Sequence, residues 1–326
     1  MNSLTFLNDR EVAGLLTPAV AVEAIKKALA AHAAGAFQMP LKVYTRPGGR
    51  ENEHTRGRFI AMPASVGGAV NAVGMKWIAS VPANVAKGID RASGLVILND
   101  PETGHPIAVM ECATLSARRT GAVAAVVFEH LGVSGQPVAI FGAGPISKEV
   151  MTTIALTGQS VGEFRIFDPD KIRASRLAEY LNSEMNISAS FVASPEAALS
   201  GSATVICSTT GAKEHIRKES LTTECRLMFP LSLDDFSEDA VLTADRIVCD
   251  DFDQCNREEK VFHHLVQKGK ITRSSIYAQL SEIITGLKPG RQNQERYFVN
   301  AMGLAIEDVA VARAVLTLHN QKQTKQ

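Results

Sequence analysis

The chain has 326 residues, 45% of them hydrophobic, and its 34 basic and 34 acidic side chains leave no net charge. This composition is typical of a globular protein large enough for two domains, and it gives no indication of binding to nucleic acid or an anionic membrane. The longest apolar run, Ala122–Phe128, is too short to cross a bilayer, and the first residues lack a charged-then-apolar signal pattern. Five dispersed cysteines without a CxxC pair, and eight histidines without HxxxH or HxH spacing, predict neither disulfides nor a metal site. We therefore expect a cytoplasmic protein with reduced thiols.

The N-terminal part begins with a helix and then changes to short strands. Thr17 and Pro18 mark a helix start, and Gly35 ends the apolar pattern that follows. The segments around Gly94–Leu98 and Pro106–Met110 flank a turn and predict a hairpin. Together with the apolar runs at 57–62 and 70–78, they predict an antiparallel domain.

A different pattern begins at Ser116, where an alanine-rich helix is expected to run to Leu131. Strands then alternate with helical segments. This predicts an α/β fold with a doubly wound, Rossmann-type parallel sheet. Its six expected strands are 138–141, 164–168, 188–192, 204–207, 227–231 and 246–249. Further helical segments are expected at 258–268, 275–284 and 302–316, followed by a frayed polar tail at 320–326.

Two glycines, Gly142 and Gly144, follow the first of these strands. Gly142 permits a tight turn, and Gly144 lets the backbone approach a pyrophosphate at the N-terminus of a helix that opens with Pro145 and Ile146. Ser147 stands where a third glycine is usual, and it is small enough for helix–strand packing. The alternative is a glycine turn of purely structural use.

Asp168 closes the second strand, 26 residues after Gly142. A carboxylate there can accept hydrogen bonds from both ribose hydroxyls of adenosine and would repel a 2′-phosphate, so the pattern favours NAD over NADP. The alternative is that Asp168 caps the next helix.

Lys76 and Arg119 are candidates for binding an anion. Lys76 lies in the apolar strand Gly74–Ile78, where a lysine needs a partner unless it faces solvent. Arg118, Arg119 and Thr120 lie in the first turn of the expected alanine-rich helix, where cations are disfavoured. A bound carboxylate or phosphate would explain them better than a solvated turn.

Asp234 and Asp235 follow the expected strand 227–231 at the carboxyl edge of the parallel sheet, where ligands of such folds bind. One of them could be a general base, although a loop aspartate that only caps a helix is the commoner case.

Six stretches together resemble the ornithine cyclodeaminase/μ-crystallin family over nearly the whole chain. They are Ala61–Pro63, Gly74–Lys76, Asn99–Pro106, Ser116–Gly121, Gly142–Gly144 and Gly303–Asp308. Within the family, the longer strings at 90–103, 250–260 and 300–308 resemble the siderophore-pathway branch that forms 2,3-diaminopropionate. The resemblance implies a homodimer, a bound NAD and hydride removal from an amino-acid Cα. For the branch it implies N-(2-amino-2-carboxyethyl)-L-glutamate as substrate, with L-2,3-diaminopropionate and 2-oxoglutarate as products.

The resemblance also assigns roles by position. Residues 1–115 with 301–326 would form a discontinuous α+β domain for substrate binding and dimerisation, and residues 116–300 the NAD-binding domain. Lys76 and Arg119 would hold a substrate carboxylate, and Asp235 would be the acid/base. Lys42 stands where cyclodeaminases have an arginine for the carboxylate. The residues implied to lie beside the cofactor, besides the glycine loop and Asp168, are Thr120, Ser208, Thr209, Thr210 and Met302.

The chain departs from the cyclodeaminases at Ile60, which stands where they have a glutamate for the side-chain amine of ornithine. An apolar residue cannot pair with an ammonium group, so ornithine is a poor fit. Five nearby arginines would suit a substrate with three carboxylates, although loop arginines are usually only solvated. They are Arg46, Arg50, Arg56, Arg58 and Arg91. Ornithine cyclodeaminase, alanine dehydrogenase and a non-catalytic cofactor-binding protein remain the alternatives.

Overall fold

The computed structural model describes residues 4–210, 214–232, 234–257 and 260–325. The chain divides into two compact units. Unit 1 comprises Met1–Arg119 and Leu304–Gln326, and unit 2 comprises Thr120–Gly303. Within the described ranges, no helix combines the length and the apolar character that crossing a membrane requires.

Unit 1 is built on a mixed sheet, which has seven strands in the described residues. β4 to β7 form an antiparallel meander, and the expected hairpin between β6 and β7 is confirmed. β1 pairs in parallel with β7, so the expectation of a purely antiparallel domain is wrong at this edge. β1 has three residues and a partner about a hundred positions away, which no local pattern reveals. The strands are β1 (Thr5–Leu7), β2 (Phe37–Gln38), β3 (Val43–Thr45), β4 (Arg58–Val66), β5 (Ala72–Ser80), β6 (Ala92–Asn99) and β7 (Pro106–Glu111).

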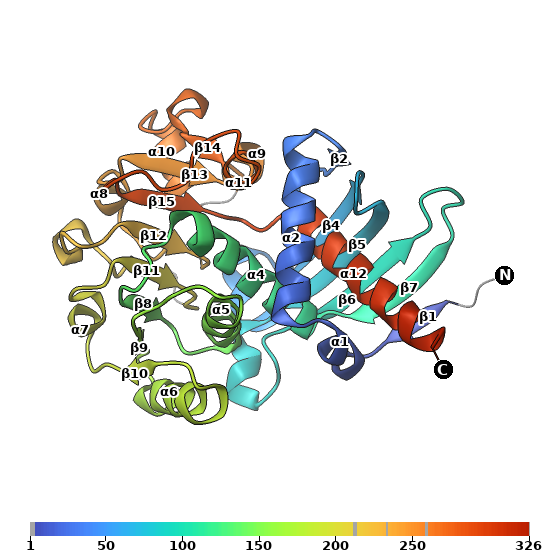
Figure 1. Ribbon diagram of the computed structural model, residues 1–326, viewed down its shortest axis with the longest axis horizontal. Helices are drawn as coiled ribbons and strands as arrows, with labels where there is room; N and C mark the ends of the chain where they lie inside the picture. Colours follow the sequence, from blue (N-terminus) through green and yellow to red (C-terminus); the bar gives the residue numbers. More distant parts are fainter. Residues whose placement is uncertain (1–3, 211–213, 233, 258–259, 326) are drawn as a thin grey trace. The chain divides into compact units, whose positions relative to one another are not determined.

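Two long helices of unit 1 pack against each other, and the C-terminal one covers a face of this sheet. α2 (Pro18–Ala33) begins as expected, with the Thr17 hydroxyl capping its N-terminus and Pro18 in its first turn. α12 (Ala305–Gln323) packs against α2 and against β4, β5 and β6, as Figure 1 shows in red and blue. The expected end at residue 316 is wrong, because the helix continues through most of the polar tail. The shorter segments are α1 (Asp9–Leu15), α3 (Glu53–Arg56), η1 (Arg50–Asn52) and η2 (Pro82–Lys87).

The alanine-rich helix α4 (Ala113–Leu131) starts three residues earlier than expected. The Asp9 carboxylate accepts a 2.8 Å hydrogen bond from the Thr114 amide, which satisfies a backbone donor at the helix start and adds a favourable negative charge there. Arg119 therefore lies in the second turn of α4. The placement in the first turn is wrong, and the unfavourable position from which a bound anion is inferred does not exist.

Unit 2 contains a parallel sheet with eight strands in the described residues, in the order β10-β9-β8-β11-β12-β15-β13-β14. Figure 1 shows this order running from β10 at the bottom to β14 at the top. The Rossmann-type sheet is confirmed, but β14 and β15 add two strands to the six expected. The strands are β8 (Val138–Phe141), β9 (Phe164–Phe167), β10 (Ala189–Phe191), β11 (Thr204–Cys207), β12 (Leu227–Pro230), β13 (Arg246–Cys249), β14 (Ala278–Gln279) and β15 (Tyr297–Asn300).

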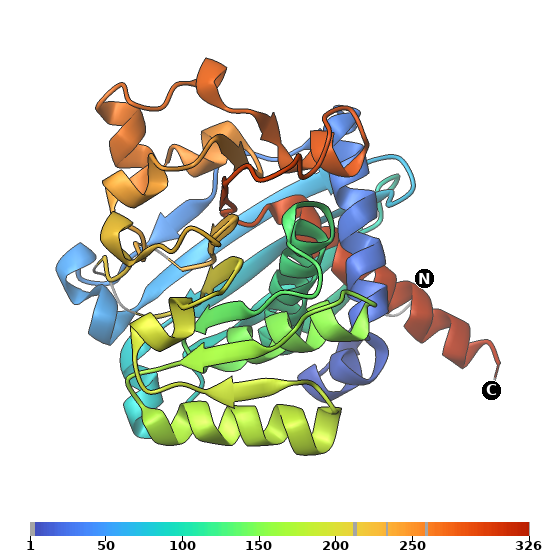
Figure 2. The ribbon, with the colours of Figure 1, turned by 60° about the vertical axis from the view of Figure 1, so that its left-hand side comes forward.

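Helices connect these strands and cover the sheet. In Figure 2, α6 (Lys171–Met185) lies along the bottom of unit 2 in yellow-green. Of the helical segment expected at 258–268, Glu258 and Glu259 lie outside the described residues, and α10 covers most of the rest. The other helical segments are α5 (Pro145–Leu156), α7 (Pro195–Leu199), η3 (Lys218–Ser220), α8 (Glu238–Val241), α9 (Phe252–Cys255), α10 (Val261–Gln267), η4 (Arg273–Ser275) and α11 (Leu280–Ile284).

Candidate active site

The glycine loop lies where the strand order of unit 2 reverses, between the adjacent strands β8 and β11. Gly142 has a φ of +97°, and a Cβ built on it would lie 2.8 Å from the Ser208 carbonyl oxygen. Any other residue would therefore be strained and would collide with the backbone that follows β11. In open α/β sheets, ligands bind at the carboxyl ends of the strands at such a reversal point.

The surroundings of Gly144 fit a pyrophosphate. Among the described residues other than its two chain neighbours, no atom lies within 4 Å of the position that a Cβ would occupy, and Gly144 is the N-cap of the twelve-residue helix α5. Pro145 and Ile146 form the first turn of this helix. Ser147 replaces the third glycine with a hydroxyl that donates to the Gly142 carbonyl at 2.6 Å and contacts the Ser208 hydroxyl. The missing glycine is thus compensated by side-chain hydrogen bonds that close the loop.

Asp168 connects this loop to the end of β9. Its carboxylate is buried and accepts 2.8 Å hydrogen bonds from the amides of Ala143 and Asp170. The helix-cap alternative for Asp168 is wrong, because Asp170 caps α6 through the Arg173 amide. A carboxylate has about four acceptor positions, so Asp168 retains capacity for ribose hydroxyls.

The remaining cofactor candidates are distributed over several segments of unit 2. Ser208 and Thr209 are half-buried directly after β11, and Thr210 is exposed. Thr120 lies in α4, and Met302 follows β15. Ser208 and Thr209 thus stand at the same sheet edge as the glycine loop.

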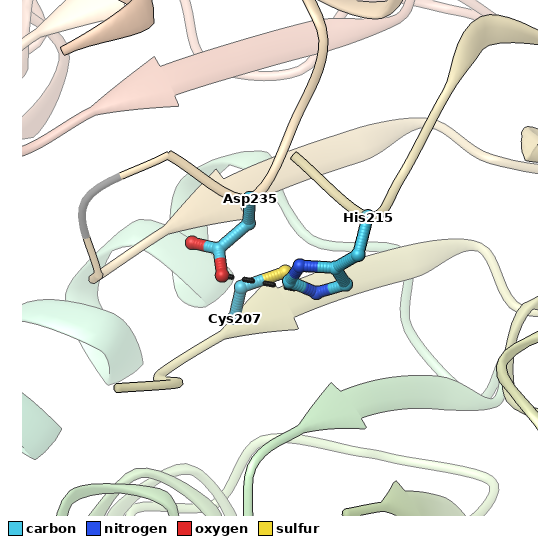
Figure 3. Close-up of side chains that lie close together, drawn as sticks. All are labelled: Cys207, His215 and Asp235. Atoms are coloured by element: carbon cyan, nitrogen blue, oxygen red, sulfur yellow. Dashed lines mark ion pairs between the residues drawn. The ribbon is translucent and has the colours of Figure 1, made fainter. Parts of the chain in front are cut away.

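Asp235 is buried after β12 and is held by hydroxyl groups. The Thr209 hydroxyl donates to its Oδ1 at 2.8 Å, and the Ser232 hydroxyl donates to its Oδ2 at 2.5 Å. His215 Nε2 lies 3.8 Å from Oδ1 (Figure 3). The neighbouring Asp234 accepts a 2.7 Å hydrogen bond from the Val261 amide at the start of α10. Asp234 therefore stabilises the start of α10, whereas Asp235 is surrounded by groups that can exchange protons.

Unit 1 contains a buried cluster of four charged side chains. Lys76 Nζ lies 2.6 Å from Asp308 Oδ1, and Arg119 Nε lies 3.0 Å from the same oxygen. Arg119 also contacts Glu307 Oε2 at 3.3 Å. The solvent-face alternative for Lys76 is wrong, because residues 72, 74, 76 and 78 of β5 all point into the core. We call Lys76, Arg119, Glu307 and Asp308 the ionic cluster.

Burial and neighbouring charges have opposite effects on the pKa values of Lys76 and Asp308 in the ionic cluster. Burial lowers the pKa of Lys76 more than the attraction of Asp308 raises it. Burial also raises the pKa of Asp308, but the charges of Arg119 and Lys76 outweigh this effect, so its pKa is lowered. The sequence reasoning missed Glu307 and Asp308, although two adjacent acids in the otherwise apolar segment 304–312 are a signal that such groups have partners.

The other candidate cations of unit 1 have partners of their own. Lys42 is half-buried, and its charge contributes to the lowered pKa of Asp308. Arg46 and Arg58 share Glu53, at 2.8 and 3.3 Å. Arg91 is half-buried and donates to the Ser80 hydroxyl at 3.3 Å.

The fold and the loop at its reversal point are those of a Rossmann-type dinucleotide-binding protein, and the family and relatives named below make its class a nicotinamide-dependent oxidoreductase. The family model of the ornithine cyclodeaminase/mu-crystallin family matches residues 4–323, and the chain belongs to this family.

Two relatives match nearly the whole chain. N-((2S)-2-amino-2-carboxyethyl)-L-glutamate dehydrogenase of Staphylococcus aureus is 35% identical over 95% of this chain and 93% of its own length. Alanine dehydrogenase of Archaeoglobus fulgidus is 31% identical over 95% of this chain and 93% of its own.

Solved structures have the same fold. An archaeal alanine dehydrogenase dimer with bound NAD has a TM-score of 0.84 and 28% identity, over 98% of this chain and 97% of its own. Δ1-pyrroline-2-carboxylate reductase of Thermococcus litoralis, solved with NADH and L-proline, has a TM-score of 0.90 and 22% identity, over 98% of both chains.

Proposed function

We propose that this chain is an NAD-dependent dehydrogenase of N-(2-amino-2-carboxyethyl)-L-glutamate. It oxidises the Cα–N bond of the glutamate part to an imine, and water then adds and the C–N bond breaks. The products are L-2,3-diaminopropionate and 2-oxoglutarate, which would serve siderophore or peptide-antibiotic synthesis. The full-length similarity to the Staphylococcus aureus dehydrogenase carries the choice of substrate.

The ionic cluster supports an anionic substrate. Its two cations, Lys76 and Arg119, are aligned on one carboxylate oxygen of Asp308, and the planar guanidinium group can bind a second carboxylate in a fixed geometry. Ion pairs with Asp308 and Glu307 keep both cations oriented before substrate arrives. In this role Lys76 and Arg119 bind the α-carboxylate, with Lys42 as a third positive charge nearby.

Asp235 is the acid/base in this proposal. It accepts a proton from the substrate nitrogen as the C=N bond forms and activates the water that adds to the imine. Hydrogen bonds from Thr209 and Ser232 fix both of its oxygens and leave lone pairs for a substrate proton or a water.

The glycine loop, the N-terminus of α5 and Asp168 would hold the dinucleotide. The open space at Gly144 and the remaining acceptor capacity of Asp168 fit a pyrophosphate and an unphosphorylated ribose. When bound, the nicotinamide would supply the hydride acceptor.

Alanine dehydrogenase activity is the second candidate, because the Archaeoglobus fulgidus enzyme is also similar over the full chain. Ornithine cyclisation is disfavoured by Ile60, which is half-buried in β4 and pairs with Tyr44 and Ile78 on the neighbouring strands. These partners are not anionic, so this position offers no carboxylate to a terminal ammonium group.

Product analysis separates these functions. The purified protein is incubated with NAD and, in turn, with aminocarboxyethyl-glutamate, L-alanine and L-ornithine, and products are identified by mass spectrometry. We expect diaminopropionate and 2-oxoglutarate from the first substrate, with one NADH per turnover. Pyruvate from alanine alone would favour the second candidate, and ammonia with proline from ornithine would contradict the proposal.

We also propose a homodimer. Val43, Trp77 and Leu95 are exposed, and the strand register aligns them across β3 to β6 on the sheet face opposite Lys76. An exposed apolar row of this kind is typical of a protein interface. A Trp77→Glu variant should sediment as a monomer, whereas Leu156→Glu, at an exposed leucine of unit 2, should sediment like the parent. A dimeric Trp77→Glu protein would rule out this face.

A further inference from the structure

Three side chains of unit 2 with metal-binding atoms lie close together. Cys207 Sγ, a ring nitrogen of His215 and a carboxylate oxygen of Asp235 are all within 4.8 Å of one another. Figure 3 shows the sulfur lying between the carboxylate and the imidazole ring. The three residues are spread over positions 207 to 235, so no metal-binding spacing appears in the sequence.

Backbone hydrogen bonds fix this arrangement. The amides of His215 and Ile216 both donate to the Asp235 carbonyl, at 3.0 and 2.9 Å, and Ile216 forms a parallel bridge with Phe236. Cys207 ends β11, which pairs residue by residue with β12. The three ligands are therefore held by neighbouring strands and by the bridge, independently of their own side-chain contacts.

We propose that Cys207, His215 and Asp235 form a binding site for Zn²⁺. A thiolate, an imidazole and a carboxylate are the ligands that zinc prefers, whereas magnesium and calcium prefer oxygen alone. Because the three atoms are at most 4.8 Å apart, an ion at the centre of their triangle lies at most about 2.8 Å from each of them, so shifts of no more than about 0.8 Å bring all three to zinc-binding distance. A water molecule completes a tetrahedral site.

Binding exchanges a proton for the metal. Burial, together with the nearby Asp235 carboxylate, raises the pKa of the Cys207 thiol well above its ordinary value, so the thiol is protonated in the metal-free protein. Zinc forms a bond to sulfur, and the thiol proton leaves to solvent. The side chain of His215, which is 31% exposed, lies on the solvent side of the cluster and gives the ion a route of entry.

Occupancy of this site would inhibit the enzyme. This consequence rests on the proposed function, in which Asp235 is the acid/base, because a carboxylate bound to zinc cannot accept a substrate proton. The site would thus make the activity sensitive to free zinc, while binding of the metal itself requires no substrate or cofactor.

Binding is tested directly on the full chain, without affinity tags and after treatment with a chelator. Calorimetric titration with Zn²⁺ should give one site per chain, and Co²⁺ should give the absorption of a sulfur–cobalt bond. His215→Gln and Cys207→Ala should each weaken zinc binding by at least ~100-fold, since even indirect supports of a metal site are worth 10- to 100-fold. His264→Gln, at an exposed histidine, and Cys225→Ala, at a buried cysteine, are matched controls that should bind normally.

These measurements can overturn the inference. The absence of a one-to-one site, a cobalt spectrum without the sulfur band, or unchanged zinc binding in His215→Gln would each rule out the site. His215 is partly exposed, so its replacement tests the ligand set even if Cys207→Ala fails to fold.

Inhibition is then tested with NAD and substrate. Zinc should inhibit the parent protein, and whatever activity His215→Gln retains should resist zinc. Zinc bound at the site without inhibition would support the metal site and contradict the role of Asp235 in the proposed function. Inhibition that is equal in the parent and in His215→Gln would show that zinc acts elsewhere, and the inference would fail.

Discussion

Asp308 and Asp235 are both buried carboxylates, but the two units hold them in opposite ways. In unit 1, two cations contact Asp308, and its charge is balanced by theirs. In unit 2, two hydroxyl groups donate to Asp235, and the imidazole of His215 lies 3.8 Å from its Oδ1. The charge of Asp308 is thus matched by neighbouring cations, whereas the oxygens of Asp235 accept from neutral hydroxyl groups and keep free lone pairs. Buried carboxylates are therefore stabilised by ion pairs in unit 1 and by hydroxyl hydrogen bonds in unit 2.

The largest effect should come from breaking the ion pair of Lys76 and Asp308. Asp308→Leu leaves the buried charge of Lys76 without its partner and should lower the free energy of unfolding by about 3–5 kcal/mol. Lys76→Met should also destabilise the fold but cost less, because Asp308 keeps its contact with Arg119. The double variant should recover at least half of the loss seen in Asp308→Leu, because Arg119 retains Glu307. Urea unfolding measures these differences. If the double variant loses the sum of the two single effects, the pair is not coupled as the structure indicates.

The second prediction tests the proposed acid/base role of Asp235 in unit 2. Asp235→Asn keeps the shape and the hydroxyl contacts but removes the base, so NADH production should fall at least ~100-fold while NAD binding is retained. Asp234→Asn is the matched control: its amide oxygen can still accept from the Val261 amide, and its rate should stay near that of the parent. Stopped-flow or steady-state absorbance of NADH measures the rates. An unchanged rate in Asp235→Asn would remove this residue from the mechanism.

Cofactor choice tests the other carboxylate of unit 2. Asp168→Ser removes the negative charge expected to face the ribose, and also weakens the hydrogen bond to the Ala143 amide. NAD binding should weaken about 10-fold or more, the scale of a hydrogen bond to a charged group, and use of NADP should improve. Ratios of kcat/KM for the two cofactors provide the measurement. A parent protein that already prefers NADP would contradict the role of Asp168.

At low pH, a variant with a neutral residue in place of Asp308 should become as stable as the parent protein. The pKa of Asp308 is lowered in the folded state, so its charge stabilises the fold above the unfolded value of about 4 and loses this effect as the pH falls through the folded value. Asp308→Asn should therefore be less stable than the parent above pH 5, and the difference between the two should shrink as the pH is lowered. Denaturant unfolding at several pH values measures this, and a constant difference would contradict it.

The sequence predicts those features that are local. The strands at 138–141, 204–207 and 246–249 agree with the structure to the residue, because each is a short apolar run between turns. The glycine loop and Asp168 are predicted for the same reason, since the turn, the strand end and the helix start lie within one segment.

Features that depend on distant residues are not predicted. The start of α4 is stabilised by Asp9, about a hundred positions away, so nothing near Ala113 marks it. The partners of Lys76 and Arg119 lie on α12, about 190 to 230 positions further along the chain, and the sequence reasoning replaced them with a bound anion. β14 is missed because a run of two residues has no readable period. β15 is also missed, although its four residues are all buried.

The smallest expected effect is a change in substrate KM when Arg91 of unit 1 is replaced. This arginine is half-buried, and burial, with repulsion from Arg58, lowers its pKa, so an additional carboxylate beside it would relieve an unfavourable charge. If Arg91 binds an outer carboxylate of the three-carboxylate substrate, Arg91→Gln should raise KM for aminocarboxyethyl-glutamate about 5- to 10-fold. It should leave kcat nearly unchanged, because the lost contact is equally strong in the ground state and the transition state.

Arg56→Gln is the matched control, since Arg56 is exposed on the same part of the unit. In the proposed function the ionic cluster binds the one carboxylate that every amino-acid substrate has, so turnover of L-alanine, where it is detectable, should be equal in both variants. A rise in KM for both substrates would instead place Arg91 with the cations that orient the α-carboxylate.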